Sequence, residues 1–274
     1  VHARSVAAGP ERGAVMSAST PLLDIQHLHK SFGGLKAVQD VSLQVPEGSL
    51  TALIGPNGAG KTTLFALMSG FLKPDSGRVQ YAGQDITGQS PEHNARLGLT
   101  RTFQIVQPFA AQTVRENIAV GAHLHLASRR EALARAEQVA AQVGLAPQLD
   151  KLASDLTVAG RKRLEMARAL ATRPRLLLLD EVLAGLNPQE IAEMIPVVRA
   201  IADSGVTVLM IEHVMQAVMS LAEQVWVLAQ GRLIAQGTPA EVTRDPAVVE
   251  AYLGHGTAER LRQRAAELVP GAPA

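Results

Sequence analysis

The first part of the chain alternates short apolar segments with Gly and Pro, a pattern typical of β-strands separated by turns. The predicted strands span residues 23–28, 41–45, 50–54 and 78–81. A helix interrupts them after Lys61, where apolar side chains recur at the spacing of a buried helix face. These side chains are Leu64, Leu67 and Met68, and Gly70 lies near the expected helix end.

The middle of the chain, from about residue 92 to 155, has mostly helical spacing, and segment 129–143 has the single apolar stripe of an amphipathic helix. Beyond Leu156, helix and buried strand alternate, which indicates an α/β fold with a parallel sheet. The expected elements are a helix at 161–171, a strand at 176–179, a helix at 191–202 and a strand at 206–211. Two further strands, 226–229 and 233–236, meet around Gly231 and predict a hairpin.

Both ends of the chain differ from this pattern. Residues 1–20 lack helical and strand periodicity and have no apolar segment of the secretory type. Because the chain begins with Val1 and Met16 lies just before the first patterned segment, we expect a start assigned too far upstream and a disordered leader. Residues 257–274 predict a short helix followed by a tail rich in Pro and Gly.

Bulk composition narrows the class of protein. The chain has 274 residues, 47% of them hydrophobic, which suffices for one sizeable domain. A net charge of +1 and an aromatic content of 3% give no basis for nucleic-acid binding. The absence of cysteine excludes disulfides and thiolate chemistry, and fits a reducing cytoplasm. The longest apolar segments are far shorter than the roughly 20 residues that cross a bilayer, so other chains would have to supply membrane spans.

The strand at 50–54 leads into a complete G-x-x-x-x-G-K-[ST] sequence that precedes the predicted helix. Its glycines let the backbone approach phosphate oxygens closely, and the N–H groups at the helix start favour the same negative charge. Lys61 supplies a cation near the terminal phosphates, and Thr62 a hydroxyl for Mg²⁺. The loop comprises Gly55, Pro56, Asn57, Gly58, Ala59, Gly60, Lys61, Thr62 and Thr63. It predicts a nucleoside triphosphate site.

Polar residues at three other positions fit the same chemistry. Asp180 and Glu181 end a strand of four leucines, where ligands of open α/β sheets bind. We expect Asp180 to hold Mg²⁺ beside Thr62, and Glu181 to orient or deprotonate water. His213 follows another buried strand and could donate to the γ-phosphate and steady the attacking water. Gln104, a weaker signal by itself, has an amide that can bind Mg²⁺ and water together.

In this order, the phosphate loop, the glutamine, the helical insertion, the Asp-Glu strand and the histidine strand resemble the ATP-binding cassette (ABC) ATPases. The resemblance covers about residues 22–254. It implies a P-loop NTPase core with a mostly parallel sheet, an N-terminal antiparallel β subdomain and an inserted helical subdomain. The ABC domain would span 21–256, with the helical subdomain at about 92–172. The resemblance also implies a head-to-tail dimer that encloses two ATP molecules with Mg²⁺.

Within that family, the residues are most similar to the ATPases of branched-chain amino acid importers. The matching segments are 31–38, 69–77, 101–104, 184–187 and 250–254. Such importers imply a second ATPase chain, with a heterodimer favoured over a homodimer, two membrane permeases and an extracytoplasmic substrate-binding protein. The chain would then lie at the cytoplasmic face of the membrane. The resemblance also implies that Phe32 stacks on adenine; the alternative is that Phe32 is a core residue at the end of a strand. It further implies that Gln104 connects the nucleotide site to the groove where the membrane partner docks.

Two positions depart from the family pattern. The signature LSGGQ is replaced by Leu-Thr-Val-Ala-Gly at 156–160, and Asn187 stands where many relatives have Asp. Thr157, Ala159 and Gly160 would still contact nucleotide across the dimer, through a hydroxyl and helix N-terminal N–H groups. We therefore expect the Glu181 site to be active when a partner completes it. The site completed by Thr157–Gly160 would turn over more slowly.

Other interpretations stay open. Urea or short-chain amide importers share much of this sequence, and a soluble ABC ATPase of Fe–S cluster assembly is a rival from another class. DNA-repair members should carry coiled coils, zinc motifs or basic surfaces, which this chain lacks. The basic residues 161–163 are interpreted as a solvated helix face. His123 and His125 do not suggest a metal site.

Overall fold

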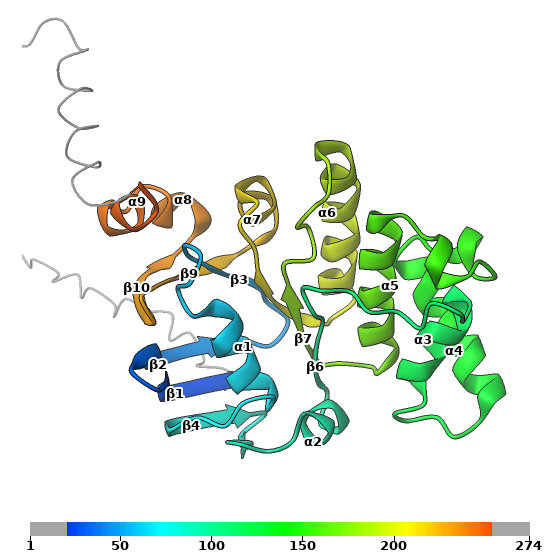
Figure 1. The fold of residues 1–274 in the computed structure, drawn as a ribbon, viewed down its shortest axis with the longest axis horizontal. Coiled ribbons are helices and arrows are strands. Elements are labelled where there is room, and N and C mark those ends of the chain that lie inside the picture. Colours follow the sequence, from blue (N-terminus) through cyan, green and yellow to red (C-terminus); the bar gives the residue numbers. More distant parts are fainter. Residues whose placement is uncertain (1–20, 254–274) are drawn as a thin grey trace, which may run out of the picture.

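The computed structural model describes residues 21–253, which form two sheets and surrounding helices (Figure 1). The expected leader and the expected helix from Thr257 lie outside the described residues. No helix between residues 21 and 253 is long and apolar enough to span a bilayer.

The N-terminal strands form a four-stranded antiparallel sheet in the order β2-β1-β4-β5. The strands are β1 (Leu23–Phe32), β2 (Leu35–Val45), β4 (Ser76–Tyr81) and β5 (Gln84–Asp85). Leu23, Ile25 and Leu28 point into the core, as the apolar pattern predicts. Both β1 and β2 extend further than predicted, because their polar ends continue to pair through the main chain up to Phe32 and Leu35.

The second sheet has six strands in the order β10-β9-β3-β8-β7-β6. They are β3 (Leu50–Ile54), β6 (Leu99–Arg101), β7 (Leu176–Asp180), β8 (Thr207–Ile211), β9 (Gln224–Ala229) and β10 (Arg232–Gly237). All neighbours pair in parallel except the hairpin β9–β10. The expected parallel sheet and the late hairpin are therefore confirmed. The short strand β6 was not predicted, because Leu-Thr-Arg has no apolar run.

Both faces of the six-stranded sheet are buried, which explains why its central strands are uniformly apolar. One face, with Leu176 and Leu178, packs against α1 (Lys61–Ser69) and the antiparallel sheet. The opposite face, with Leu177 and Leu179, belongs to a core shared with helices from α3 onward. Those helices are α3 (Val114–Ala122), α4 (Arg129–Gln142), α5 (Val158–Ala171), α6 (Pro188–Asp203), α7 (Met215–Leu221), α8 (Pro239–Val242) and α9 (Pro246–Leu253).

The segment between β6 and β7 forms a separate helical group at one end of the molecule (Figure 1). It contains α3, α4 and α5, with 3-10 turns at Ala146–Gln148 and Ala153–Asp155, while α2 (Pro91–Arg96) precedes β6. Gly121 of α3 touches α5 so closely that an added Cβ would overlap the carbonyl oxygen of Arg168. Residues 102–113 connect β6 to α3 and contact α5, since Lys162 and Arg168 of that helix donate to the carbonyl oxygens of Gln104 and Gln107.

Candidate nucleotide site

The loop from Gly55 to Thr63 connects β3 to α1, as predicted, and its glycines serve two purposes. Gly55 and Gly60 have positive φ angles of 150° and 104°, and an added Cβ would overlap the carbonyl oxygens of Leu228 and Ala37. These two glycines are needed for packing inside the protein. Gly58, with φ 77°, has no heavy atom of the described chain within 4 Å of an added Cβ. It therefore leaves space on the open side of the loop.

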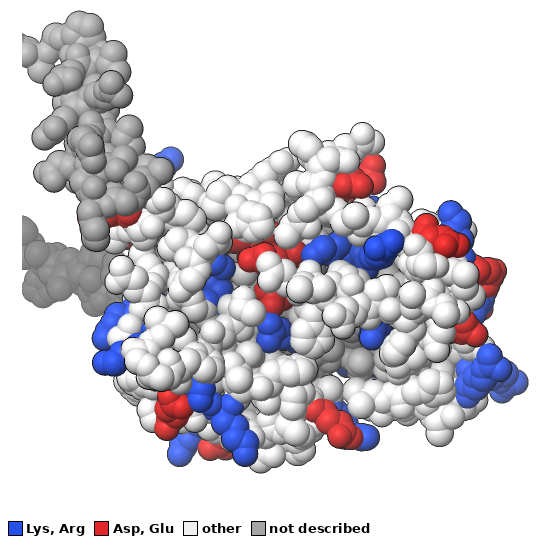
Figure 2. Space-filling model, in the orientation of Figure 1, with Lys and Arg blue, Asp and Glu red and all other residues white. Residues whose placement is uncertain are grey.

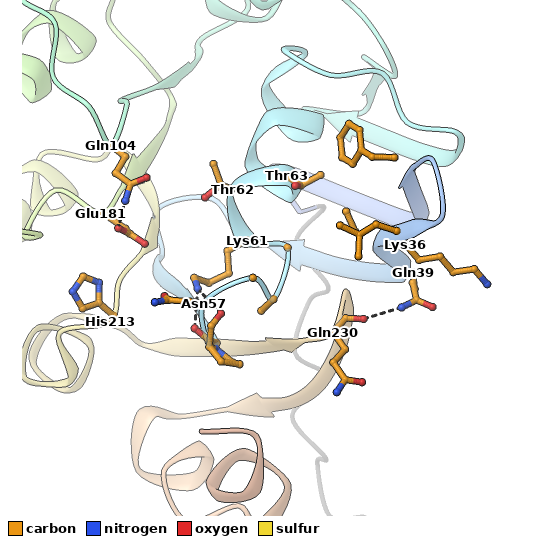
Figure 3. Close-up of a pocket in the computed structure, with 18 of the residues that line it drawn as sticks. Lys36, Gln39, Asn57, Lys61, Thr62, Thr63, Gln104, Glu181, His213 and Gln230 are labelled. Atoms are coloured by element: carbon orange, nitrogen blue, oxygen red, sulfur yellow. Dashed lines mark hydrogen bonds between the residues drawn. The ribbon is translucent and has the colours of Figure 1, made fainter. Parts of the chain in front are cut away.

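A cavity of about 1280 Å³ lies over this loop. Figure 3 shows Gln104, Glu181 and His213 along one side, Lys61 and Asn57 in the middle, and Gln39 and Gln230 at the other end. The carboxyl ends of β3, β7 and β8 and the segment after β6 deliver Lys61, Asn57, Glu181, His213 and Gln104, because all four strands run parallel. Gln39 comes from β2 and Gln230 from the turn between β9 and β10. In the space-filling view, basic and acidic side chains meet in a hollow near the middle of the molecule (Figure 2).

Lys61 is the cation of the loop itself. Its side chain is buried, and Nζ donates to the carbonyl oxygens of Gly55 at 2.7 Å and Pro56 at 3.1 Å. Burial lowers the pKa of Lys61, while Glu181 and Asp180 oppose that shift. At the N-terminus of α1, Gly60 has no side chain to cap the helix, and the first turn contains no acidic residue. The helix start is thus open to an anion from the cavity.

Asp180 lies at the end of β7 and is 1% exposed. Its Oδ2 accepts a hydrogen bond from Arg101 at 2.6 Å, and its N–H donates to Thr102 Oγ1. Oδ1 is buried and has no hydrogen-bond partner within the described chain. The guanidinium of Arg101 is itself 7% exposed and lies within 6.0 Å of three phenylalanine ring centres. Sequence reasoning missed Arg101, because only the pairing of β6 with β7 places it beside Asp180.

The residues expected to hold Mg²⁺ fit that ion. Thr62, Gln104 and Asp180 line one cavity of about 510 Å³. They offer a hydroxyl, an amide oxygen and a carboxylate, the hard oxygen donors that Mg²⁺ prefers. The unpartnered Oδ1 of Asp180 supplies a free acceptor there. Within residues 21–253, no group of three His, Cys, Asp or Glu side chains could hold a metal by itself, so any Mg²⁺ bound here would depend on this mixed set and on phosphate oxygens.

Glu181 follows Asp180 with a φ of 49°, a left-handed conformation that is uncommon for a residue other than Gly. Its Oε2 accepts a hydrogen bond from Gln104 Nε2 at 2.6 Å. His213 is exposed and lines the same cavity. The structure therefore brings together the three residues predicted to act on water, and it holds two of them in direct contact.

A buried carboxyl, that of Glu212, directly precedes His213 and was not singled out from the sequence. Glu212 is 1% exposed, and its Oε1 accepts from the N–H of Leu183 at 3.0 Å. Burial raises the pKa of Glu212 to about 7, and the nearby Glu181 adds to the increase, whereas the N–H of Leu183 opposes it. Its position next to His213 was visible in the sequence, but its burial was not.

The interpretation of residues 161–163 as a solvated helix face is wrong for Lys162. This residue is buried, and Nζ donates to the carbonyl oxygens of Gln104 and Glu181. Arg161 and Arg163 are likewise engaged with carbonyl oxygens, those of Leu156 and Val143. Of the three side chains, Lys162 alone is buried, because the main chain after β6 and after β7 lies against its side of α5, whereas Arg161 is exposed and Arg163 partly exposed.

The residues expected to act across a dimer lie away from this cavity. Thr157 caps α5, and its hydroxyl accepts from the N–H of Gly160 at 3.1 Å. Gly160 is buried, and this bond to Thr157 satisfies its N–H inside the chain. Val158 is exposed and Ala159 partly exposed. None of Thr157, Ala159 and Gly160 lines the cavity over the Gly55–Thr63 loop.

Two aromatic residues border the cavity. Phe32 is 46% exposed, so it is not the core residue of the alternative interpretation, and Lys30 Nζ lies 5.6 Å from its ring centre. Tyr252 on α9 was not assigned a role from the sequence. Burial raises the pKa of Tyr252, and a hydrogen bond with the main chain of Gly55 opposes that shift. Helix α9 thus borders the Gly55–Thr63 loop, a contact that no local pattern predicts.

Comparison with known proteins agrees with this geometry. A family model described as "ABC transporter" matches residues 38–184, and one described as "Branched-chain amino acid ATP-binding cassette transporter" matches residues 232–258. The chain is 40% identical to the high-affinity branched-chain amino acid transport ATP-binding proteins LivG of Salmonella typhimurium and BraF of Pseudomonas aeruginosa. Each match covers 86% of this chain and 99% of the relative.

Solved structures are similar as well. A nucleotide-free ATP-binding cassette from an ABC transporter superimposes with a TM-score of 0.79 at 32% identity. Another ABC transporter cassette, in its ADP conformation, gives 0.78 at 33% identity. Both matches cover 86% of this chain and the whole of the solved chain. The two-sheet arrangement with a helical group is therefore an architecture shared with solved cassettes of ABC transporters.

Arg101 and Asp180 form a buried ion pair, in which each side chain neutralises the charge of the other. Arg101→Met leaves the Asp180 carboxylate buried without its cation, which we expect to lower the free energy of unfolding by about 3–5 kcal/mol. Adding Asp180→Asn should recover part of this loss. Urea unfolding of the two single variants and the double variant measures the coupling. Strictly additive losses would contradict the pairing.

Glu212 should make stability depend on pH. Its pKa is raised on folding, so the stabilisation is fully present below about 4.5 and is lost as the pH rises through about 7. Glu212→Gln removes the ionisation, so the variant should equal the native chain near pH 4.5 and exceed it by up to about 3 kcal/mol at pH 8. Urea unfolding across this range tests the difference, which should be flat if Glu212 does not titrate.

Proposed function

The chain belongs to the ATP-binding cassette family of transporter ATPases, and we propose that it powers the import of branched-chain or related amino acids through separate permease subunits. The observation that carries this proposal is the single cavity that joins the Gly55–Thr63 loop with Gln104, Glu181 and His213. The names of the relatives and the C-terminal family model at residues 232–258 support the class of substrate. They favour it over urea or amide import and over Fe–S cluster assembly.

ATP would bind with its phosphates on the loop and its base near Phe32. Lys61 would exchange its bonds to the carbonyls of Gly55 and Pro56 for bonds to the β- and γ-phosphates. The uncapped N-terminus of α1 adds N–H donors and the favourable end of the helix dipole. The exposed ring of Phe32 offers a surface on which adenine can stack.

Thr62, Asp180 and Gln104 would hold Mg²⁺, which when bound neutralises charge on the phosphates. Asp180 has an acceptor to offer, since Oδ1 has no partner within the described residues. Arg101 holds the other oxygen of Asp180 and so keeps the carboxylate oriented. Gln104 would turn its amide from Glu181 toward the nucleotide, which breaks their hydrogen bond.

Glu181 would then be free to accept a proton from the attacking water. The water oxygen attacks the γ-phosphorus, and the bond from that phosphorus to the bridging oxygen of ADP breaks. The proton from the water passes to Glu181 or to the phosphate product, and ADP leaves with the electron pair of the broken bond. His213 would donate to the γ-phosphate and steady the water. Closure and reopening of the site would drive the permeases.

We infer partners from the same resemblance. They are a second ATPase chain, two membrane permeases and an extracytoplasmic substrate-binding protein, with this chain peripheral at the cytoplasmic face. Exposed apolar side chains beside Gln104 support a docking surface for a permease. They are Phe71, Phe103, Ile105 and Phe109. The capped turn Thr157–Gly160 supports a heterodimer, since a partner with a glycine-containing signature would complete the Glu181 site more closely than this chain completes the partner's.

Glu181→Gln should separate binding from hydrolysis. The amide keeps the size and the hydrogen bond to Gln104 but cannot accept a proton, so turnover should fall at least about 100-fold while ATP affinity changes little. Glu92→Gln on the exposed surface of α2 serves as the matched control. Release of phosphate and binding of a fluorescent ATP analogue are measured in parallel. Unchanged turnover in the complete complex would refute the assignment of Glu181.

The proposed partners predict a membrane-bound complex. A tagged chain purified from detergent extracts of its source cells should bring two multi-span proteins and a second ATPase chain with it. The complex should hydrolyse ATP several-fold faster when the extracytoplasmic substrate-binding protein is present with its amino acid bound, because substrate arrival is transmitted through the permeases. Stimulation by a urea receptor instead would reassign the substrate. Purification without membrane proteins would favour the soluble ABC class.

A further inference from the structure

Lys162 connects two segments that carry predicted site residues. It lies on α5 and is only 7% exposed, yet it ends in an ammonium group. Nζ donates to the carbonyl oxygen of Gln104 and to that of Glu181, each at 3.1 Å. Gln104 belongs to the connection after β6 and Glu181 to the turn after β7. One buried cation therefore bonds to the main chain of both.

The burial of this ammonium needs a reason. Burial lowers the pKa of Lys162, and four carboxylates oppose that shift through their charges: Glu212, Glu181, Asp180 and Glu165. A buried charge of this kind gains little net stability compared with an apolar side chain of similar length. What Lys162 does provide is the fixed position of two carbonyl groups. Its contribution is thus to the geometry of the site rather than to the core.

Two further residues of α5 hold the same connection. Arg168 donates to the carbonyl oxygen of Gln107 at 3.0 Å and lies 5.1 Å from the ring centre of Phe109. Glu165 is buried and accepts a hydrogen bond from the main-chain N–H of Phe103. Segment 103–109 is therefore attached to one side of α5 at three positions. Its outer side is open, with Ile105 74% exposed.

The link through Lys162 differs from the link through the side chains. Gln104 Nε2 also donates to Glu181 Oε2. That bond must break when both side chains turn to the phosphates and water, as the proposed function requires. The bonds from Lys162 go to main-chain oxygens, so they do not compete with the chemistry. Lys162 is consequently able to keep the two segments together throughout turnover.

We propose that Lys162 is a positioning residue that makes segment 103–109 and Glu181 move together with α5. Nucleotide in the cavity is then sensed at the exposed side of the segment, and displacement of the segment repositions Glu181. This inference rests on the proposed function, because it requires that the chain bind ATP and hydrolyse it with Glu181. Glu181 already has a left-handed backbone, a conformation that persists only where surrounding contacts hold it, and the bond from Lys162 to its carbonyl is one of those contacts.

The absence of cysteine allows a direct test with the full chain. Ile105→Cys is labelled with a nitroxide, and its mobility is measured by electron paramagnetic resonance with and without Mg·ATP. With Lys162 present, we expect ATP to change the mobility of the label. Lys162→Met should abolish this response while the dissociation constant for ATP stays within about threefold. In the unlabelled chain, kcat should fall at least about tenfold with little change in KM.

Arg163→Met is the matched control, because Arg163 lies on the same helix and also donates to a carbonyl, that of Val143. It should keep both the label response and kcat. Lys162→Arg retains charge and donors and should restore both in part. Should Lys162→Met fail to fold, Lys162→Gln is compared with Lys162→Arg by the same two measurements. An intact label response and kcat in the Met or Gln variant overturn the inference. Failure of the Lys162-containing chain to bind ATP overturns the proposed function instead.

Discussion

The parallel pairing of β6, β7, β8 and β3 is the constraint on which the rest of the site depends. Parallel strands end at the same edge of a sheet, so four separate segments of the chain deliver their next residues to one place. Those residues are the Gly55–Thr63 loop, Gln104, Glu181 and His213. The pairing tolerates little change, because both sheet faces are buried and a shift by one residue would exchange the two cores.

Three cations in and around the site bond to oxygen atoms of the protein itself. Lys61 bonds to loop carbonyls, Arg101 to Asp180, and Lys162 to the main chain of Gln104 and Glu181. Each of these three cations is thus engaged with the protein's own oxygen atoms. The three differ in what a ligand must displace. Lys61 has to release its carbonyls to reach phosphate, whereas Arg101 and Lys162 can keep their partners.

The divergent turn at 156–160 is compatible with a well-formed helix. Thr157 caps α5 by accepting from Gly160, so the turn is stable without a glycine at positions 158 and 159. Val158 and Ala159 then place Cβ atoms on the exposed side, where a nucleotide held by a partner chain would have to approach. Local stability and close approach are therefore separate requirements, and this segment meets the first.

The sequence by itself determined the features whose physics is local. A glycine loop between a buried strand and a helix, and two carboxylates at the end of four leucines, need only neighbouring residues to be recognised. Only the tertiary structure decided the roles of Arg101, Lys162 and Glu212, and the burial that makes them important. Arg101 and Asp180 are 79 residues apart, and Lys162 and Gln104 are 58 apart. Hydrogen bonding and desolvation act over a few ångströms of space, so no pattern along the chain records which distant groups will meet.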